Sequence, residues 1–437
     1  MSGKGPSARA AILAIGDEIV LGQKTNTNSV WLAERLAAVG VMTVEHVSVE
    51  DDLERIRAAM LRLAADCPIV LCTGGLGPTA DDLTRDALAG ALGEPLVEDD
   101  EALRAIGAAL AKRGREMTSA HRVQALRPRS AAALPNAVGT APGLRAAVGG
   151  ATVYCLPGPP NEMKPMFEAL VLPQIGGSGE AISTRLIQVC GLVESDAAQR
   201  LGEILDRKRN PTVGITVSRT TVTLRLRHRG ERADAERLLD ETERAIRERL
   251  GPLVFGVGEE TLAASVLGLL LPREETVATV ESCTGGMVGA MLSDVPGSSG
   301  AFLGGWVTYS DAMKSREVAV PPDAILRHGA VSETVARAMA EGGLISAQAD
   351  HALAVTGIAG PGGGSEAKPV GTVFIARSSR RGAGVDTEVR RFLFPGSRDD
   401  VRERSAAAAL NMLRLYAMGE RVSPLAWERM EIDEPAV

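Results

Sequence analysis

The stretch that decides the fold of the C-terminal part reads Thr276-Val277-Ala278-Thr279-Val280-Glu281-Ser282-Cys283-Thr284-Gly285-Gly286. Its first five residues are apolar or β-branched, which predicts a short buried strand. The residues that follow the two glycines can continue as a helix. Backbone N–H groups at such a strand-to-helix turn lack partners, so they can hold a phosphate or a developing oxyanion. Ser282 is therefore either a helix N-cap or a nucleophile that needs a nearby base.

Strands and helices alternate through the N-terminal part of the chain. We expect strands over 10–15, 42–49 and 68–72, each followed by an amphipathic helix. This order predicts a three-layer α/β domain over 1–175 with a mostly parallel sheet. Ligands bind such sheets at the carboxyl ends of the strands. The loops that begin at Gly16, Gly74 and Gly158 each follow an expected strand and could therefore share one crevice.

The pattern changes after the glycine-rich segment 176–179, which we take as a boundary. Residues 180–257 show a β-α-β-β-α order, which predicts a small α+β module that serves as a linker or lid. Residues 258–420 alternate strands and helices again and predict a C-terminal α/β domain. The polar tail over 421–437 is expected to fray.

Composition limits the possible functions and partners. The 437 residues carry a net charge of -7, and only 3% are aromatic, which argues against direct nucleic-acid binding. The five cysteines have neither metal-site nor disulfide spacing, as expected of reduced thiols in a cytoplasmic protein. No signal peptide and no apolar run of about 18 residues is present, so we expect no membrane association.

A glycine-rich loop with two carboxylates lies in the N-terminal part, reading Thr73-Gly74-Gly75-Leu76-Gly77-Pro78-Thr79-Ala80-Asp81-Asp82. Its three glycines would let the backbone approach a ligand closely. Asp81 and Asp82 either cap the next helix and complement its dipole or hold a divalent cation beside a phosphate. Asp17 and Glu18, at the end of the first strand, form a second acidic pair.

These loops resemble the molybdopterin-binding (MoCF) domain of the competence/damage-inducible CinA family. The matching residues lie at 16–18 with Gly22, at 26–28, at 73–82 and at 158–163. The resemblance implies a metal-dependent ADP-ribose pyrophosphatase that yields AMP and ribose 5-phosphate. The ligand-binding candidates are Gly16, Asn28, Thr73, Gly74, Gly75, Gly77, Thr79, Gly158 and Pro159. The candidate ligands of the divalent cation are Asp17, Glu18, Asp81 and Asp82.

A second group of candidate residues surrounds Ser282. Tyr309 ends an expected strand, and Lys314 follows five residues later in a helical turn. A lysine can act as a base only when burial or a nearby cation depresses its pKa; otherwise Lys314 is a solvated surface residue. Such a serine–lysine pair would need no histidine, and none of the five histidines has a triad-like context. The glycine-rich loop over 357–364 follows another expected strand.

These residues resemble the C-terminal CinA domain, whose family activity is nicotinamide mononucleotide (NMN) deamidation. The match covers 281–286, 307–314, 356–364, 369–372 and 396–402. The resemblance implies that Ser282 attacks the carboxamide and that Lys314, relayed by Tyr309, takes the serine proton, with no cofactor. The candidates for substrate binding are Thr284, Gly285, Gly286, Gly357, Ala359, Gly360 and Gly362. Asp311 stands where asparagine is expected and would raise the pKa of Lys314.

Three interpretations remain open on the sequence. The first is an enzyme with two activities that recycles NAD breakdown products and whose small-molecule partners are NMN and ADP-ribose. The second is a regulatory or binding protein in DNA uptake or damage response. The third is a molybdopterin-binding protein, which rests on fold analogy alone. The family resemblance also implies a homodimer.

Overall fold

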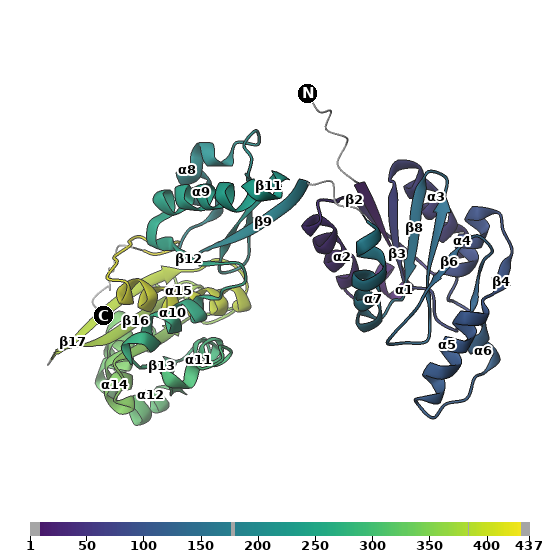
Figure 1. Ribbon diagram of the computed structural model, residues 1–437. Coiled ribbons are helices and arrows are strands. Elements are labelled where there is room, and N and C mark those ends of the chain that lie inside the picture. Colours follow the sequence, from purple (N-terminus) through teal and green to yellow (C-terminus); the bar gives the residue numbers. More distant parts are fainter. Residues whose placement is uncertain (1–8, 176–179, 383, 430–437) are drawn as a thin grey trace. The chain divides into compact units, whose positions relative to one another are not determined.

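The computed structural model describes residues 9–175, 180–382 and 384–429 (Figure 1). The expected boundary at 176–179 lies outside the described residues. The chain divides into two compact units, one made of Met1–Ser183 with His228–Glu236 and the other of Thr184–Arg227 with Arg237–Val437. Both units are mixed α/β, which confirms the expected fold class.

The N-terminal sheet has the strand order β2-β1-β3-β8-β7-β6. The first four of these strands are parallel, and the last two add an antiparallel edge. In spatial order the strands are β2 (Met42–Val49), β1 (Arg9–Ile15), β3 (Ile69–Thr73), β8 (Ala151–Leu156), β7 (Gly143–Val148) and β6 (Ala132–Leu134). The parallel strands therefore bring the ends of β1, β3 and β8 to one edge of the sheet.

Helices cover both faces of this sheet because alternate residues of each strand point to opposite sides. Ala11 and Leu13 pack with α3 (Leu53–Asp66) and α4 (Thr84–Leu92). Ile12 packs on the other face. Its helical neighbours there are α2 (Thr27–Ala38) and α7 (Pro160–Met166). The remaining helices of this part are α1 (Asp17–Val20), α5 (Asp100–Ala111) and α6 (Ser119–Val123). The result is the three-layer arrangement that the sequence predicts.

The middle of the chain forms a four-stranded sheet with the order β10-β11-β9-β12. Its strands are β9 (Glu180–Val189), β10 (Thr212–Val217), β11 (Val222–Glu231) and β12 (Val254–Val257). Its helices are α8 (Glu194–Leu201) and α9 (Arg232–Leu250). The strand β12 had not been expected from the sequence.

The C-terminal sheet has the order β14-β13-β15-β16-β17. Its strands are β13 (Val277–Glu281), β14 (Phe302–Val307), β15 (His351–Gly357), β16 (Thr372–Arg381) and β17 (Gly384–Leu393). Because β13 is parallel to both β14 and β15, Glu281 lies opposite Val307 on one side and Val355 on the other. The ends of these three strands therefore lie side by side.

Two groups of helices sandwich this sheet. The helices α10 (Leu262–Leu270), α11 (Met287–Ser293) and α15 (Arg398–Ala417) pack on the face of Val277 and Leu353. The opposite face carries α14 (Glu333–Ala347), which packs against Val280 together with Val318. Val318 ends α12 (Asp311–Val318), and α13 (Pro322–His328) follows it. In the part of the chain that the structure describes, no helix is both apolar and long enough to span a membrane.

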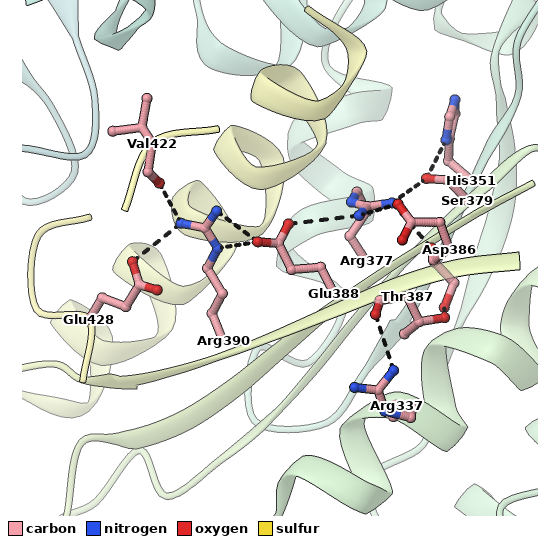
Figure 2. Close-up of polar contacts among 11 residues, drawn as sticks. Arg337, His351, Arg377, Ser379, Asp386, Thr387, Glu388, Arg390, Val422 and Glu428 are labelled. Atoms are coloured by element: carbon pink, nitrogen blue, oxygen red, sulfur yellow. Dashed lines mark hydrogen bonds and ion pairs between the residues drawn. The ribbon is translucent and has the colours of Figure 1, made fainter. Parts of the chain in front are cut away.

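The segment after α15 corrects an expectation, because residues 420–429 do not fray. Leu425 is buried, and the backbone N–H of Ala426 donates to the Gly191 carbonyl of the middle module. Arg390 donates to the Val422 carbonyl and forms an ion pair with Glu428 at 3.2 Å (Figure 2). The buried Arg390 needs these acceptors, and Leu425 needs apolar cover, so the segment is held down despite its polar composition.

Figure 2 shows that this contact belongs to a longer polar network on β16 and β17. Glu388 lies between Arg390, at 2.9 Å, and Arg377, at 3.7 Å. Arg377 also donates to Ser379, whose hydroxyl is 2.8 Å from the Nδ1 atom of His351. His351 is therefore a structural residue of this network.

We predict that Leu425→Ala lowers the free energy of unfolding of the C-terminal unit by about 2–4 kcal/mol, because a buried leucine leaves a cavity when truncated. Chemical denaturation of the full chain measures the change. Leu326→Ala is the matched control, since 84% of Leu326 is exposed and its truncation should change stability by less than about 0.5 kcal/mol. Equal effects of the two substitutions would show that residues 420–429 do not stabilise the fold.

Candidate active sites

The Ser282 loop connects β13 to α11. Gly285 and Gly286 have φ values of 63° and 97°, a left-handed conformation that favours glycine and turns the chain into the helix. The backbone N–H of Ser282 donates to the Val355 carbonyl at 2.9 Å, which ties the loop to the end of β15. Ser282 is 8% exposed, so its hydroxyl lies in a largely dry environment.

Lys314 lies in α12, directly across from this serine. Its Nζ atom is 3.3 Å from Ser282 Oγ and 3.0 Å from the Thr308 carbonyl oxygen. The hydroxyl of Ser310 caps α12 by accepting from the Met313 N–H, so the helix begins where Lys314 can turn back toward β13. Lys314 is only 1% exposed, in contrast to a solvated surface lysine.

Burial lowers the pKa of Lys314, because the apolar surroundings disfavour its charged form. The carboxylate of Asp311, 4.0 Å away, acts in the opposite direction and raises the pKa. The net direction is downward, since Asp311 is largely exposed and its charge is screened by solvent. A neutral amine within 3.3 Å of a serine hydroxyl can accept the hydroxyl proton.

The side chain of Tyr309 contacts Arg398, and its expected role as a proton relay stays a prediction. Its phenol is 60% exposed and accepts a hydrogen bond from Arg398 at 2.9 Å. The backbone carbonyl of Tyr309, at 3.4 Å, is the part of this residue that contacts the Lys314 amine. Sequence reasoning could not separate these two possibilities, because only the direction of the strand end decides which group faces the lysine.

Two of the backbone N–H groups that could hold an oxyanion in the Ser282 loop already have acceptors. The Gly285 N–H donates to the Ser282 carbonyl at 3.1 Å, and the Gly286 N–H donates to Glu281 at 3.0 Å. Both groups are therefore already satisfied within the loop. Among the described residues, the Thr284 N–H donates to no other group, and the Cys283 N–H contacts only the sulfur of its own side chain, which leaves these two as candidate donors beside Ser282.

Glu281 has a role that we did not predict. Its buried carboxylate accepts hydrogen bonds from the N–H groups of Gly286, Val288 and Gly289, at 2.8–3.0 Å. It thus occupies the N-terminus of α11, where an anion would otherwise bind. A charged residue at the end of an apolar strand was the sequence signal for this role.

The glycine loop after β15 lies against the same site. Ala359 is buried in the same apolar cluster as Cys283. Arg398, at the start of α15, donates to the Gly360 carbonyl at 2.7 Å as well as to the Tyr309 phenol. Arg402, one turn later, donates to the Thr284 carbonyl at 3.0 Å. The first turns of α15 therefore join the loops that carry the candidates Thr284, Gly285, Gly286, Gly357, Ala359, Gly360 and Gly362.

The N-terminal unit contains a separate cavity of about 690 Å³ at the ends of β1, β3 and β8. All nine ligand-binding candidates of this domain line it, namely Gly16, Asn28, Thr73, Gly74, Gly75, Gly77, Thr79, Gly158 and Pro159. The amide of Asn28 holds two of the loops together by donating to Thr73 Oγ1 at 3.0 Å and to the Gly158 carbonyl at 2.7 Å. The three expected loops do share one crevice.

The four carboxylates proposed as cation ligands are not gathered into one cluster. Glu18, Asp81 and Asp82 line the cavity, whereas Asp17 does not and accepts from the Asp51 N–H instead. Asp82 accepts from the N–H groups of Gly77 and Thr79, so it shapes the loop rather than capping α4. Within the described residues, no three His, Cys, Asp or Glu side chains are placed to hold a metal ion.

The carboxylates of this cavity influence one another. Desolvation raises the pKa of Asp51, and the negative charges of Asp17, Asp81 and Glu18 raise it further. A hydrogen bond from Thr79 lowers the pKa of Asp81. The cavity is therefore a concentration of negative charge, which a cation brought in with a phosphate-containing ligand would relieve.

Three protein-family models match the chain. The probable molybdopterin binding domain matches residues 11–177, the damage-inducible protein CinA KH domain matches 184–279, and the CinA C-terminal domain matches 259–417. A putative competence-damage inducible protein from Symbiobacterium thermophilum is 42% identical over 94% of this chain and 99% of its own length. A protein of the same description from Caldicellulosiruptor bescii is 40% identical over 93% and 98%.

The chain also resembles a solved structure, described as the protein CinA from Thermoplasma acidophilum. The two share 34% identity over 38% of this chain and 99% of that one, with a TM-score of 0.36.

We predict that Asp311→Asn lowers the pKa of Lys314 further, because it removes the negative charge that stabilises the ammonium form. A pH titration of the Lys314 side chain by NMR measures the pKa, and its signal can be assigned with Lys314→Met. Asp323→Asn is the matched control, since that carboxylate pairs with Arg327 instead. An unchanged or raised pKa in Asp311→Asn would contradict the assigned contact.

Proposed function

The chain belongs to the CinA family, and we propose that its C-terminal domain hydrolyses the carboxamide of nicotinamide mononucleotide to nicotinic acid mononucleotide and ammonia. The observation that carries this proposal is the 3.3 Å distance between the buried Lys314 amine and the Ser282 hydroxyl. A nucleophile beside a base of lowered pKa is what amide hydrolysis requires.

In the proposed reaction, Ser282 Oγ attacks the carboxamide carbon while its proton passes to the neutral Lys314 amine. The C–N bond of the tetrahedral intermediate then breaks, and Lys314 returns the proton to the leaving nitrogen, which departs as ammonia. Water next attacks the acyl-enzyme and loses a proton to Lys314. The proton returns to Ser282 as nicotinic acid mononucleotide is released.

The negative oxygen of the intermediate needs donors near Ser282. The N–H groups of Cys283 and Thr284 are the candidates, since those of Gly285 and Gly286 are engaged. Glu281 supports this assignment indirectly, because it fixes the start of α11 and thereby the course of the loop. Burial of the pair keeps water away from Lys314 and lowers its pKa, which favours the neutral form that the reaction needs.

We predict that Ser282→Ala lowers the rate of ammonia release from NMN by on the order of 10⁴-fold or more, because the acyl-enzyme cannot form. Lys314→Met, which keeps the length of the side chain, should lower the rate about 10²- to 10⁴-fold. A coupled ammonia assay measures both. Ser293→Ala and Lys208→Met replace exposed residues and are the matched controls. Retention of activity in Ser282→Ala would reject the proposed nucleophile.

For the N-terminal domain we propose hydrolysis of ADP-ribose to AMP and ribose 5-phosphate. The cavity of about 690 Å³, with its glycine loop and adjacent carboxylates, supports a phosphate-containing ligand. A divalent cation is part of this proposal. One or two carboxylates suffice for Mg²⁺ when the phosphates of a substrate supply further oxygens. Glu18 and Asp81 line the cavity, whereas both carboxylate oxygens of Asp82 already accept hydrogen bonds from its own loop.

The two proposed activities should respond in opposite ways to two treatments. We predict that a chelator abolishes AMP formation from ADP-ribose but leaves ammonia release from NMN unchanged, because only the first activity uses a cation. Ser282→Ala should do the reverse. Chromatography of AMP and the ammonia assay on the same sample measure both, and added Mg²⁺ or Mn²⁺ should restore AMP formation. Loss of both activities with the chelator would contradict a metal-free deamidase.

The names of the relatives refer to competence and to induction by damage. A binding or regulatory role is therefore the alternative to the two proposed enzyme activities. The net charge of -7 disfavours direct contact with DNA. If neither NMN nor ADP-ribose is hydrolysed while the protein retards DNA at physiological salt, the alternative is favoured. The homodimer is likewise a proposal, which light scattering of the full chain would test.

A further inference from the structure

A buried carboxamide without a partner lies at the wall of the N-terminal cavity. Gln124 directly follows α6, lines the cavity and is only 2% exposed. Its Oε1 atom is buried and has no hydrogen-bond partner among the described residues. Burying an amide oxygen without a hydrogen-bond donor costs free energy. A bound ligand that donates to this oxygen would account for the side chain at this position.

A second buried group, behind the glycine loop of the cavity, indicates where the anionic part of the ligand lies. The guanidinium of Arg85 donates to the carbonyls of Leu76 and Gly77, within the glycine loop. Arg85 is 2% exposed and forms no ion pair in the described part of the chain. A buried positive charge behind a glycine loop suits a phosphate at that loop. The uncharged carboxamide of Gln124 would then contact an uncharged part of the same ligand.

We propose that Gln124 recognises the adenine base of the nucleotide that binds in this cavity. A carboxamide presents a donor and an acceptor side by side, and adenine presents the complementary pair in its 6-amino group and adjacent ring nitrogen. The amide oxygen accepts from the 6-amino group, and the amide nitrogen donates to the ring nitrogen. Ile15, Leu76 and Ala141 line the same cavity and offer apolar surface to the ring. This assignment rests on the proposed ADP-ribose activity and adds the recognition of its base.

The test compares two ligands on two proteins. Purine riboside 5′-monophosphate lacks the 6-amino group of AMP but keeps the sugar, phosphate and ring. Calorimetric titration should show that the wild-type chain binds AMP about tenfold more tightly than this analogue, the discrimination expected of a good carboxamide–base pair. Gln124→Met, which keeps the size of the side chain, should bind the two ligands about equally. Gln174→Met is the matched control, because Gln174 is exposed, and should retain the wild-type preference.

A stability measurement separates ligand recognition from a structural role. The carboxamide of Gln124 has no partner without ligand, so Gln124→Met should leave the melting temperature of the unliganded protein unchanged or raised. A structural glutamine would instead destabilise the fold when replaced. Should Gln124→Met fail to fold, Gln124→Leu tests the same contact, because it removes the oxygen that accepts from the 6-amino group and should also abolish the tenfold preference.

The outcomes for this inference and for the proposed activity are distinguishable. If ADP-ribose is hydrolysed but Gln124→Met keeps the full preference for AMP, the role of Gln124 is overturned and the activity stands. If ADP-ribose is not hydrolysed but the preference depends on Gln124, base recognition stands and the activity falls. No measurable binding of AMP by the wild-type chain, or tighter binding of a pterin than of AMP, would overturn the adenine assignment.

Discussion

The burial of the Lys314 amine is the constraint on which the C-terminal site depends. A charged ammonium would be costly at a position that is 1% exposed with its nearest carboxylate 4.0 Å away. The amine has three oxygen neighbours to which its N–H groups can donate, those of Ser282 and of the Thr308 and Tyr309 carbonyls. These oxygens meet only because β14 ends beside β13 and α12 begins at once after it. The order of the strands therefore determines the chemistry that the serine can perform.

The two domains position their loops by the same device. In each case the first residue after a strand donates its N–H to a carbonyl at or near the end of a neighbouring parallel strand. Gly16 donates to Val49 and Gly74 to Leu156 in the N-terminal domain, and Ser282 donates to Val355 in the C-terminal domain. Each of these hydrogen bonds extends the pairing of two strands by one residue and fixes the start of the loop. Candidate residues that are far apart in the sequence therefore meet at one edge of the sheet.

The sequence was sufficient to predict the features that depend on hydrophobic periodicity and strand order. It was insufficient to predict the contacts that depend on the direction of a side chain. The strand before Ser282 and the loop at Gly74 could both be predicted, because a run of apolar residues marks the first and glycines mark the second. The contacts of the Tyr309 phenol and of the Glu281 carboxylate could not, since they depend on where a strand end points. The burial of Leu425 was missed because one apolar residue in a polar segment has no periodicity.

The electrostatic needs of the two proposed reactions explain why the chain carries two sites. A base such as Lys314 works only when neutral, and nearby carboxylates would raise its pKa and keep it protonated. The N-terminal cavity has the opposite character, since its carboxylates already raise the pKa of Asp51. A lysine placed there would remain charged, and a cation placed beside Lys314 would find one nearby carboxylate, that of Asp311. Each chemistry would thus weaken the other in a shared cavity, and separation into two units removes the conflict.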